Sequence, residues 1–404
     1  MPESFGRKTD LPKKLVVLGS TGSIGVNTLK IIEAIPERFS LVGISAGRNL
    51  ALLEKQIKKF HPYAVAVEKP ELMNQLRVML GPEPPRILCG PEGIAELAGM
   101  DGVDTVVSAI SGFAGLLPTL TAVKKGKRVA LANKESMVVG GGLIVKAAMK
   151  SGAEIIPVDS EHSAVFQCLL GNNKDYLRRI ILTASGGPFL NTQFNKLKKV
   201  DPQTALRHPK WKMGRKITVD SATFMNKALE IIEAKWLFNT PPEMIDVLIH
   251  PECIVHSMVE FADGSIIAQM GVTDMRIPIS FALTFPERLE TGLKGLNLVS
   301  TKGLHFIEPD RKKFPSLDYA YEALSACNGS GGTMPVVLNA SNEEAVNAFL
   351  AREIGFMDIF KTIDYTLKKH TPSIPESIED ILDVDREARE YAKEYIFRRR
   401  RKIR

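Results

Sequence analysis

Three acidic side chains in the middle of the chain could together hold a metal ion. Asp159 and Glu161 lie two positions apart, and Glu230 follows in a stretch predicted to be helical. In an extended segment residues i and i+2 share a face, so we expect the first two carboxylates to lie together. Two close carboxylates repel each other unless a proton or a cation lies between them. Carboxylate ligands without cysteine favour Mg²⁺ or Mn²⁺ over zinc, although such a pair is often only a solvated loop.

A phosphate group could bind beside this metal. Ser185 precedes two glycines, and Ser221, Asn226 and Lys227 lie at the start of the same predicted helix as Glu230. Hydroxyls, an amide, an ammonium group and a helix N-terminus are the donors that a phosphate monoester requires. Each segment alone would be an ordinary cap or turn. Together with the carboxylates, they predict a metal site next to a phosphate site.

Residues 208–214 form a third unusual segment. They place His208 and Trp211 in a short loop that also contains Pro, Lys, Met and Gly214. The simple interpretation is a tryptophan packed on the surface. The alternative is a lid that closes over the substrate and excludes water during catalysis.

A glycine-rich loop at the start of the chain predicts a nucleotide site. Gly19, Gly22 and Gly25 follow a β-branched run directly and open a helical stretch. A pyrophosphate there needs a tight turn, a close backbone approach and free N–H groups at a helix N-terminus. An ordinary strand-to-helix turn is the alternative, but the position of the loop at the start of an alternating α/β region favours a dinucleotide.

The end of the second predicted strand distinguishes between the two nicotinamide cofactors. An NAD site usually has Asp or Glu there to hold the ribose hydroxyl. This chain has Gly47, Arg48 and Asn49 instead, with no carboxylate. Because a guanidinium pairs with a 2′-phosphate and a carboxylate would repel it, the sequence favours NADPH over NADH.

The elements that must position these residues alternate up to about residue 158. Short β-branched runs are separated by helical stretches, which predicts right-handed crossovers and a parallel, Rossmann-like sheet. The runs are residues 14–18, 41–45, 64–67, 105–109, 128–131 and 154–158. Asp159 and Glu161 then lie at the carboxyl end of the last run, the side of such a sheet where ligands usually bind.

After residue 158 the pattern becomes α+β. We predict a strand at 179–183, a second at 217–219, a helix from 223 to 238 capped by Asp220 or Ser221, and a hairpin of 254–261 and 265–270 around Asp263 and Gly264. Residues 317–326, 336–352, 357–369 and 378–397 have helical periodicity and predict a small bundle. The predicted domains are 1–158 for NADPH, 159–290 for catalysis, metal binding and dimerisation, a connector at 291–316, and a helical domain at 317–404 with a basic tail.

Composition limits the remaining interpretations. The chain has 404 residues and a formal charge of +7, but the six basic residues between 398 and 404 account for all but one of these charges. The body is therefore close to neutral, which argues against a nucleic-acid surface. Four unclustered cysteines suit a reducing compartment, and neither a secretory signal nor a membrane span is recognisable. We expect a bacterial cytoplasmic protein with no nucleic-acid or membrane partner.

These motifs together resemble the 1-deoxy-D-xylulose 5-phosphate reductoisomerase family. The resemblance rests on the glycine loop, Asn133-Lys134-Glu135, the Asp159–His162 segment, Ser185-Gly-Gly, the loop at 208–214 and the segment 221–230, in that order along nearly the whole chain. Only the basic tail lies outside the family pattern. The resemblance implies an NADPH- and Mg²⁺- or Mn²⁺-dependent homodimer that converts 1-deoxy-D-xylulose 5-phosphate into 2-C-methyl-D-erythritol 4-phosphate in non-mevalonate isoprenoid synthesis.

The resemblance also implies a role for each matching residue. The cofactor would be held by Thr21, Gly22, Ser23, Ile24, Gly47, Arg48, Asn49, Asn133, Glu135 and Gly214. The metal would be held by Asp159, Glu161 and Glu230. The substrate would contact Lys134, Ser160, Glu161, Ser185, His208, Ser221, Asn226, Lys227 and Glu230, with Trp211 closing over it. Lys134 and Glu161 are the candidates for proton transfer.

The implied reaction fits the chemistry of these residues. A Lewis acid at the ketone would stabilise alkoxide or enolate charge while the skeleton rearranges, by retro-aldol and aldol steps or by an alkyl shift, and NADPH would reduce the resulting aldehyde. One alternative is another NADP-linked enzyme, such as a semialdehyde or homoserine dehydrogenase, which would need no metal triad. The other alternative is a basic nucleic-acid-binding protein. Only the basic tail favours it, and the tail lacks the interleaved aromatic residues on which bases would stack.

Overall fold

The computed structural model describes residues 12–207, 214–290 and 292–403. Its backbone contacts divide it into two compact units. The first comprises residues 1–136, 142–163 and 274–294, and the second comprises 137–141, 164–273 and 295–404. The predicted loop residues His208 and Trp211 lie outside the described residues.

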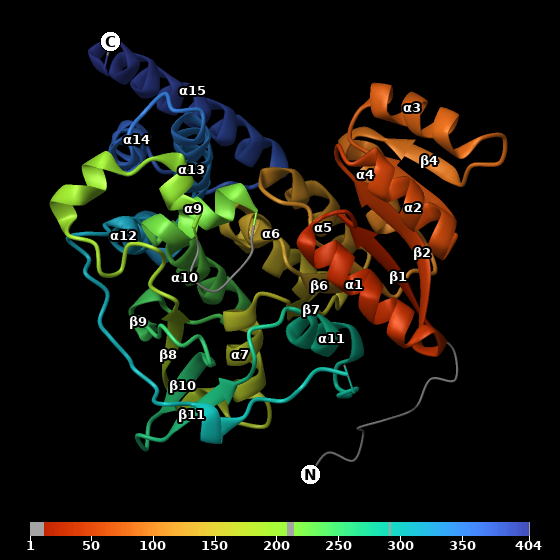
Figure 1. The fold of residues 1–404 in the computed structure, drawn as a ribbon, viewed down its shortest axis with the longest axis horizontal. Coiled ribbons are helices and arrows are strands. Elements are labelled where there is room, and N and C mark those ends of the chain that lie inside the picture. Colours follow the sequence, from red (N-terminus) through yellow and green to blue (C-terminus); the bar gives the residue numbers. More distant parts are fainter. Residues whose placement is uncertain (1–11, 208–213, 291, 404) are drawn as a thin grey trace. The chain divides into compact units, whose positions relative to one another are not determined.

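The first unit is built on a seven-stranded sheet in the order β4-β3-β2-β1-β5-β6-β7, in which every pair is parallel (Figure 1). Its strands are β1 (Lys13–Leu18), β2 (Phe39–Ala46), β3 (Ala64–Val67), β4 (Arg86–Cys89), β5 (Thr105–Ser108), β6 (Arg128–Leu131) and β7 (Ile155–Pro157). The central strand is apolar on both faces, and residues 15–18 have no exposed surface. Continuous apolar strands of this kind are typical of a parallel sheet covered by helices on both sides.

The sequence prediction found six of these seven strands and missed β4. That strand has four residues, and Arg86 and Ile87 at its start keep contact with solvent. It lies at the edge of the sheet, so its sequence lacks the buried β-branched run that marks the other strands. The predicted parallel sheet is confirmed.

Helices connect these strands. They are α1 (Ser23–Ala34), α2 (Leu50–Phe60), α3 (Pro70–Leu80), α4 (Gly90–Gly99), α5 (Leu116–Lys124) and α6 (Lys134–Ser151), with short 3₁₀ turns η1 (Pro36–Arg38) and η2 (Phe113–Gly115). α11 (Arg276–Thr284) comes from much later in the chain and packs against α1 in the same unit. Lys13 and Arg128 donate hydrogen bonds of 3.2 and 2.7 Å to the carbonyls of Leu283 and Phe285, which fixes the end of this helix.

The second unit holds a four-stranded sheet in the order β11-β10-β8-β9. Its strands are β8 (Leu177–Ala184), β9 (Ile245–Ile249), β10 (Val255–Phe261) and β11 (Ile266–Met270). β8 pairs in parallel with β9 and antiparallel with β10. The predicted hairpin of β10 and β11 is confirmed, and at its tip the Asp263 carboxylate accepts the Ser265 N–H at 2.9 Å while Gly264 adopts φ +84°.

Two helices replace the strand and single helix predicted between residues 217 and 238. α9 (Arg215–Thr223) contains the supposed strand, and α10 (Met225–Phe238) follows after a break at Phe224. The strand prediction was wrong because the β-branched run at 217–219 is stabilised as a helix, in which Lys216 pairs with Asp220 one turn later. The predicted cap residues, Asp220 and Ser221, therefore lie inside α9 rather than before α10.

Four helices of the C-terminal part match the prediction. They are α12 (Ser316–Gly329), α13 (Met334–Leu350), α14 (Phe356–Lys369) and α15 (Ile378–Ile403), and α13 contacts each of the other three (Figure 1). α15 runs to Ile403, so most of the basic segment continues a helix. The unit also contains α7 (Ser160–Leu169), which begins in the first unit, α8 (Pro202–Ala205), and the 3₁₀ turns η3 (Lys174–Tyr176), η4 (Phe194–Lys199), η5 (Pro242–Met244) and η6 (Leu298–Ser300). Among the described residues, no helix is long and apolar enough to span a bilayer.

Candidate active site

The glycine loop follows β1 and leads into α1, as predicted. Gly19 has φ +78°, and a side chain there would come within 2.5 Å of the Ala109 carbonyl oxygen. A side chain at Gly25 would collide with the Gly19 carbonyl. Thr21, Gly22 and Ser23 lie between these two positions, at the N-terminus of α1, where backbone N–H groups point out of the helix. The loop therefore has the close backbone approach that a pyrophosphate needs.

Polar contacts lock the loop to its neighbours. The Gly19 N–H donates to the Ser45 hydroxyl at 3.0 Å, and the Ser20 N–H donates to the Ser45 carbonyl at 2.8 Å. The buried Gln56 amide of α2 bonds to both the hydroxyl and the carbonyl of Ser20, at 2.7 and 2.9 Å. These bonds tie the loop to the end of β2, where Gly47, Arg48 and Asn49 are exposed. Asn49 also caps α2 by accepting the Leu52 N–H at 3.1 Å.

Asn133 occupies the turn between β6 and α6 and is almost fully buried. Its amide nitrogen donates to the carbonyls of Ile110 and Gly112 at 2.5 and 2.9 Å, and its oxygen accepts the Ser136 N–H at 2.8 Å. The side chain thus caps α6 and holds the Gly112 loop after β5. Glu135 follows in the first turn of α6 and stays partly exposed.

The predicted acidic pair lies immediately after β7. The Asp159 and Glu161 carboxylates each place an oxygen within 4.8 Å of the other. The Lys134 ammonium lies 2.9 Å from Asp159, and the Ser160 hydroxyl donates to Glu161 at 2.6 Å. The buried His162 ring lies farther from Asp159, at 3.9 Å. Two carboxylates this close, with one ammonium beside them, form a suitable pair of ligands for a hard divalent cation.

The pair is close for a different reason from the one predicted. Ser160 begins α7, so Glu161 lies in the first turn of a helix rather than on one face of an extended strand. The helix turns Glu161 back toward Asp159, and its N-terminus favours negative charge. The expected proximity is confirmed, whereas the expected extended geometry was wrong.

In the second unit, two segments approach each other through their backbones. Gly186 and Gly187 follow β8 with φ of +86° and +63°, and a side chain on Gly187 would lie 2.7 Å from the Ser221 carbonyl oxygen. The Gly187 N–H donates to the Ser185 hydroxyl at 3.2 Å. The two glycines therefore allow the predicted phosphate ligands Ser185 and Ser221 to come from adjoining turns.

α10 carries the other predicted ligands in its first two turns. Glu230 is fully buried, and its carboxylate accepts the Asn226 amide at 2.5 Å and also pairs with the Lys227 ammonium. A buried carboxylate requires such compensation, because removing an ion from water costs several kcal/mol. The helix thus presents an amide, an ammonium and a carboxylate close together. The amide of Asn226 and the ammonium of Lys227 lie in its first turn, at the positive end of the helix dipole.

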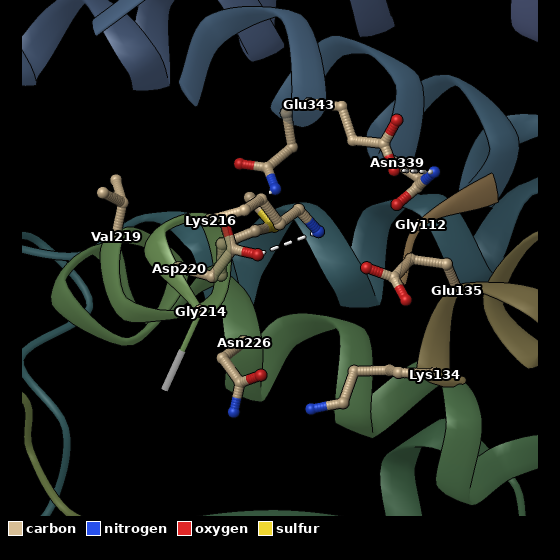
Figure 2. A network of polar contacts seen from close by, with 12 residues as sticks. Gly112, Lys134, Glu135, Gly214, Lys216, Val219, Asp220, Asn226, Asn339 and Glu343 are labelled. Atoms are coloured by element: carbon tan, nitrogen blue, oxygen red, sulfur yellow. Dashed lines mark hydrogen bonds and ion pairs between the residues drawn. The ribbon is translucent and has the colours of Figure 1, made fainter. Parts of the chain in front are cut away.

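Some polar residues near this site were not predicted from the sequence. Asp220 is 1% exposed, and its carboxylate pairs with the Lys216 ammonium at 2.9 Å (Figure 2). It also accepts a hydrogen bond of 2.9 Å from the Asn342 amide. Asn339 and Asn342 are fully buried in α13. Two carboxamides at buried positions of α13 are a signal that sequence analysis could have used, since buried amides need partners.

The Cys168 thiol offers no alternative nucleophile. Cys168 lies in α7 and is buried. Burial raises the pKa of the Cys168 thiol to about 11, so it stays protonated at neutral pH and is a poor nucleophile.

Comparison with known proteins identifies the family. Models described as 1-deoxy-D-xylulose 5-phosphate reductoisomerase, its C-terminal domain, and the DXP reductoisomerase C-terminal domain match residues 15–141, 155–238 and 270–391. The reductoisomerase of Chlorobaculum tepidum is 52% identical over 95% of this chain and 100% of its own length. The reductoisomerase of Geobacter metallireducens is 51% identical over 95% of this chain and 99% of its own length. The chain belongs to the 1-deoxy-D-xylulose 5-phosphate reductoisomerase family.

Solved structures of this family agree with the fold. A reductoisomerase from Zymomonas mobilis in complex with NADPH is 44% identical, with a TM-score of 0.89 over 95% of this chain and 99% of its own. A reductoisomerase in complex with NADPH, fosmidomycin and magnesium is 39% identical, with a TM-score of 0.88 over 95% of this chain and 98% of its own. The predicted family, fold class and enzyme class are thereby confirmed, and neither the dehydrogenase nor the nucleic-acid alternative is favoured.

Proposed function

We propose that this enzyme isomerises and reduces 1-deoxy-D-xylulose 5-phosphate to 2-C-methyl-D-erythritol 4-phosphate, using NADPH and a divalent cation. One observation within the first unit supports this most directly. The glycine loop, Asn133 with Lys134, and Asp159 with Glu161 follow β1, β6 and β7 of one parallel sheet. Because the carboxyl ends of parallel strands lie along one edge, nucleotide ligands and metal ligands share that edge.

NADPH would bind along this edge. Its pyrophosphate would contact the loop of Thr21, Gly22, Ser23 and Ile24 at the N-terminus of α1. Arg48 is exposed at the end of β2, where it would pair with the 2′-phosphate between Gly47 and Asn49. Asn133 holds the Gly112 loop in place, so it would shape the NADPH site. Glu135 and Gly214 would complete that site.

The metal ion would be held by Asp159, Glu161 and Glu230. The close pair at the start of α7 fits a hard cation, and Glu230 is a buried carboxylate whose chemistry fits the same ion. When bound, Mg²⁺ or Mn²⁺ supplies a Lewis acid and NADPH supplies a hydride. Lys134 balances the charge of Asp159, and it would donate or accept a proton on the carbon skeleton.

The substrate's phosphate would bind in the second unit. Ser185, Ser221, Asn226 and Lys227 come from two adjoining turns and from the N-terminus of α10, and they supply hydroxyl, amide and ammonium donors. Ser160 and Glu161 would contact the carbon skeleton. His208 would lie beside the phosphate and Trp211 would close over the substrate to exclude water, although both are outside the residues that the structure describes.

The activity is tested by following NADPH oxidation with 1-deoxy-D-xylulose 5-phosphate. We expect turnover with Mn²⁺ or Mg²⁺, none after treatment with a chelator, and recovery when metal is added back. NADH in place of NADPH should be a poor reductant, because Arg48 would lose its phosphate partner. Metal-independent turnover, or none with either metal, would contradict the proposal.

We also propose that two copies form a homodimer through β11, and that the dimer works in the bacterial cytoplasm. β11 is an edge strand of its sheet, and Ile266 and Ile267 on it are 52% and 37% exposed. Apolar edge strands are often covered by pairing with a second chain. Light scattering should give a dimer, and replacing Ile267 by Lys should shift the mass to that of a monomer.

A further inference from the structure

The turn between α9 and α10 connects the proposed phosphate ligands. Ser221 lies before it, and Asn226 and Lys227 lie after it. Phe224, at its centre, has φ +62°, a strained conformation that bulky residues rarely adopt. Such a residue persists only where its surroundings hold it, so the groups that contact this turn determine where the phosphate ligands lie.

Two of these contacts come from the residues at the start of α12. The Ser316 hydroxyl donates to the Thr223 carbonyl at 2.8 Å, and both groups are buried. The Phe314 ring stacks on Phe224 with 4.7 Å between ring centroids. The helical C-terminal part of the second unit therefore holds the turn directly.

The third contact is made by Asn342 of α13. Its amide nitrogen donates at 2.9 Å to one oxygen of Asp220. The Lys216 ammonium lies 2.9 Å from the other oxygen (Figure 2). Asp220 is the neighbour of Ser221 in the chain. An uncompensated carboxylate at this position would repel a phosphate dianion, and it would also be free to leave its present orientation.

The carbonyl oxygen of Asn342 helps to define its role. This oxygen is buried and finds no hydrogen-bond partner in the part of the chain that the structure describes. A buried acceptor without a partner destabilises a fold. The bond that the Asn342 amide donates to Asp220 is therefore the feature to explain.

We propose that Asn342 is a positioning residue for the substrate's phosphate and acts through Asp220. Its amide and Lys216 compensate the Asp220 carboxylate from two sides, which keeps Ser221 and the start of α10 in the geometry that accepts an anion. The inference rests on the proposed function, because it takes the anion to be the phosphate of the sugar substrate. It adds a residue of the C-terminal helical part to a site formed by α9 and α10.

The test compares N342L with S341A. Leucine has a similar volume but cannot donate, and Ser341 is an equally buried neighbour whose hydroxyl bonds only within α13, to the Leu338 carbonyl. For N342L we expect KM for 1-deoxy-D-xylulose 5-phosphate and the Kd for inorganic phosphate, measured by calorimetry, to rise together about tenfold, as for a lost hydrogen bond to a charged group. The Kd for NADPH should stay unchanged, and kcat should fall less than KM rises. S341A should leave all four constants at wild-type values.

Folded N342L with wild-type KM and phosphate Kd would overturn the proposal. Equal losses of NADPH and phosphate affinity would also overturn it, because they would indicate general disruption. If N342L does not fold, N342S is measured against the same criteria. Failure of the proposed function is a separate result: the wild type would not turn over the sugar phosphate, while the comparison of phosphate Kd values would still decide the role of Asn342.

Discussion

The Lys134 ammonium and the Asp159 carboxylate are joined at 2.9 Å, and their side chains are only 8% and 20% exposed. The two residues follow neighbouring strands, β6 and β7, so the parallel sheet itself brings them together. An ion pair with so little contact with water is far less screened than a surface pair. Lys134 therefore holds Asp159 in place, and in the proposed reaction it would exchange a proton near the proposed metal ligands.

Replacing Lys134 by Met should lower kcat about a hundredfold or more, the loss typical of removing a positioned acid, base or electrostatic group. The variant leaves Asp159 without its cation, so metal affinity should change as well. Steady-state kinetics and metal titration measure both effects. Lys146 lies on the same helix with an exposed side chain, and K146M should retain wild-type values. Wild-type kcat in K134M would exclude a catalytic role.

Replacing Glu230 by Gln should abolish turnover while NADPH binding stays within about twofold, because the change removes a proposed metal ligand and keeps the shape of the side chain. Activity and NADPH fluorescence give the two quantities. E243Q, at an exposed acidic position in η5, serves as the control. Full activity in E230Q would remove Glu230 from the metal site.

Replacing Gly19 by Ala should weaken NADPH binding at least tenfold. The added Cβ would lie 2.5 Å from the Ala109 carbonyl oxygen, and the residue has φ +78°, so the loop must move. Gly152 provides a matched control, since it has φ +74° but open space around it. G152A should lose about 1 kcal/mol of stability with no change in NADPH affinity. Equal NADPH affinities in the two variants would contradict the assigned role of the loop.

The parts of the site that sequence analysis placed correctly are local. The glycine loop after β1 and the acidic pair after β7 each depend on a strand and on the helix that follows it, and their patterns are visible within a few residues. The break at Phe224 was not visible, because no glycine or proline marks it and contacts such as Phe314 stabilise it. The bond between Asn342 and Asp220 joins residues 122 positions apart. Such pairings depend on tertiary packing, which no local periodicity records.

Acid should weaken the ion pair at the start of α11 in the first unit. Arg276 holds the pKa of the Asp274 carboxyl below its ordinary value of 3.8, against a smaller opposing effect of burial. A carboxyl with a lowered pKa in the folded state stabilises the fold above its ordinary pKa, and this contribution is lost as pH falls through the folded-state value. D274N should lose about 0.5 kcal/mol at pH 7, a small figure because the pair is partly exposed.

Chemical denaturation at pH 7 and at a series of acidic pH values measures this difference. We expect the stabilities of D274N and the wild type to converge in acid, where the wild-type carboxyl is also neutral. R276Q should reproduce the same loss at neutral pH. A gap between D274N and the wild type that stays constant with pH would show that charge is not responsible.

The basic segment at the end of the chain should stabilise the second unit rather than bind nucleic acid. Arg399 pairs with Asp358 at 2.6 Å, and Arg400 pairs with Glu353. Asp358 is only 6% exposed and also accepts the Gly355 N–H at 3.2 Å, so it fixes the start of α14. These bonds attach the last turns of α15 to the adjacent helix, and they occupy two of the arginines that a nucleic acid would need.

Deleting residues 398–404 should therefore lower the free energy of unfolding by about 1–2 kcal/mol, because a mostly buried carboxylate loses one of its cations. KM and kcat should stay unchanged, as should the negligible affinity for DNA at physiological salt. R386A is the matched control, since Arg386 and its partner Asp383 are both 71% exposed and such pairs contribute little. A deletion that leaves stability intact but removes measurable, salt-dependent DNA binding would reverse this interpretation, because it would show that the arginines act on a polyanion rather than on α14.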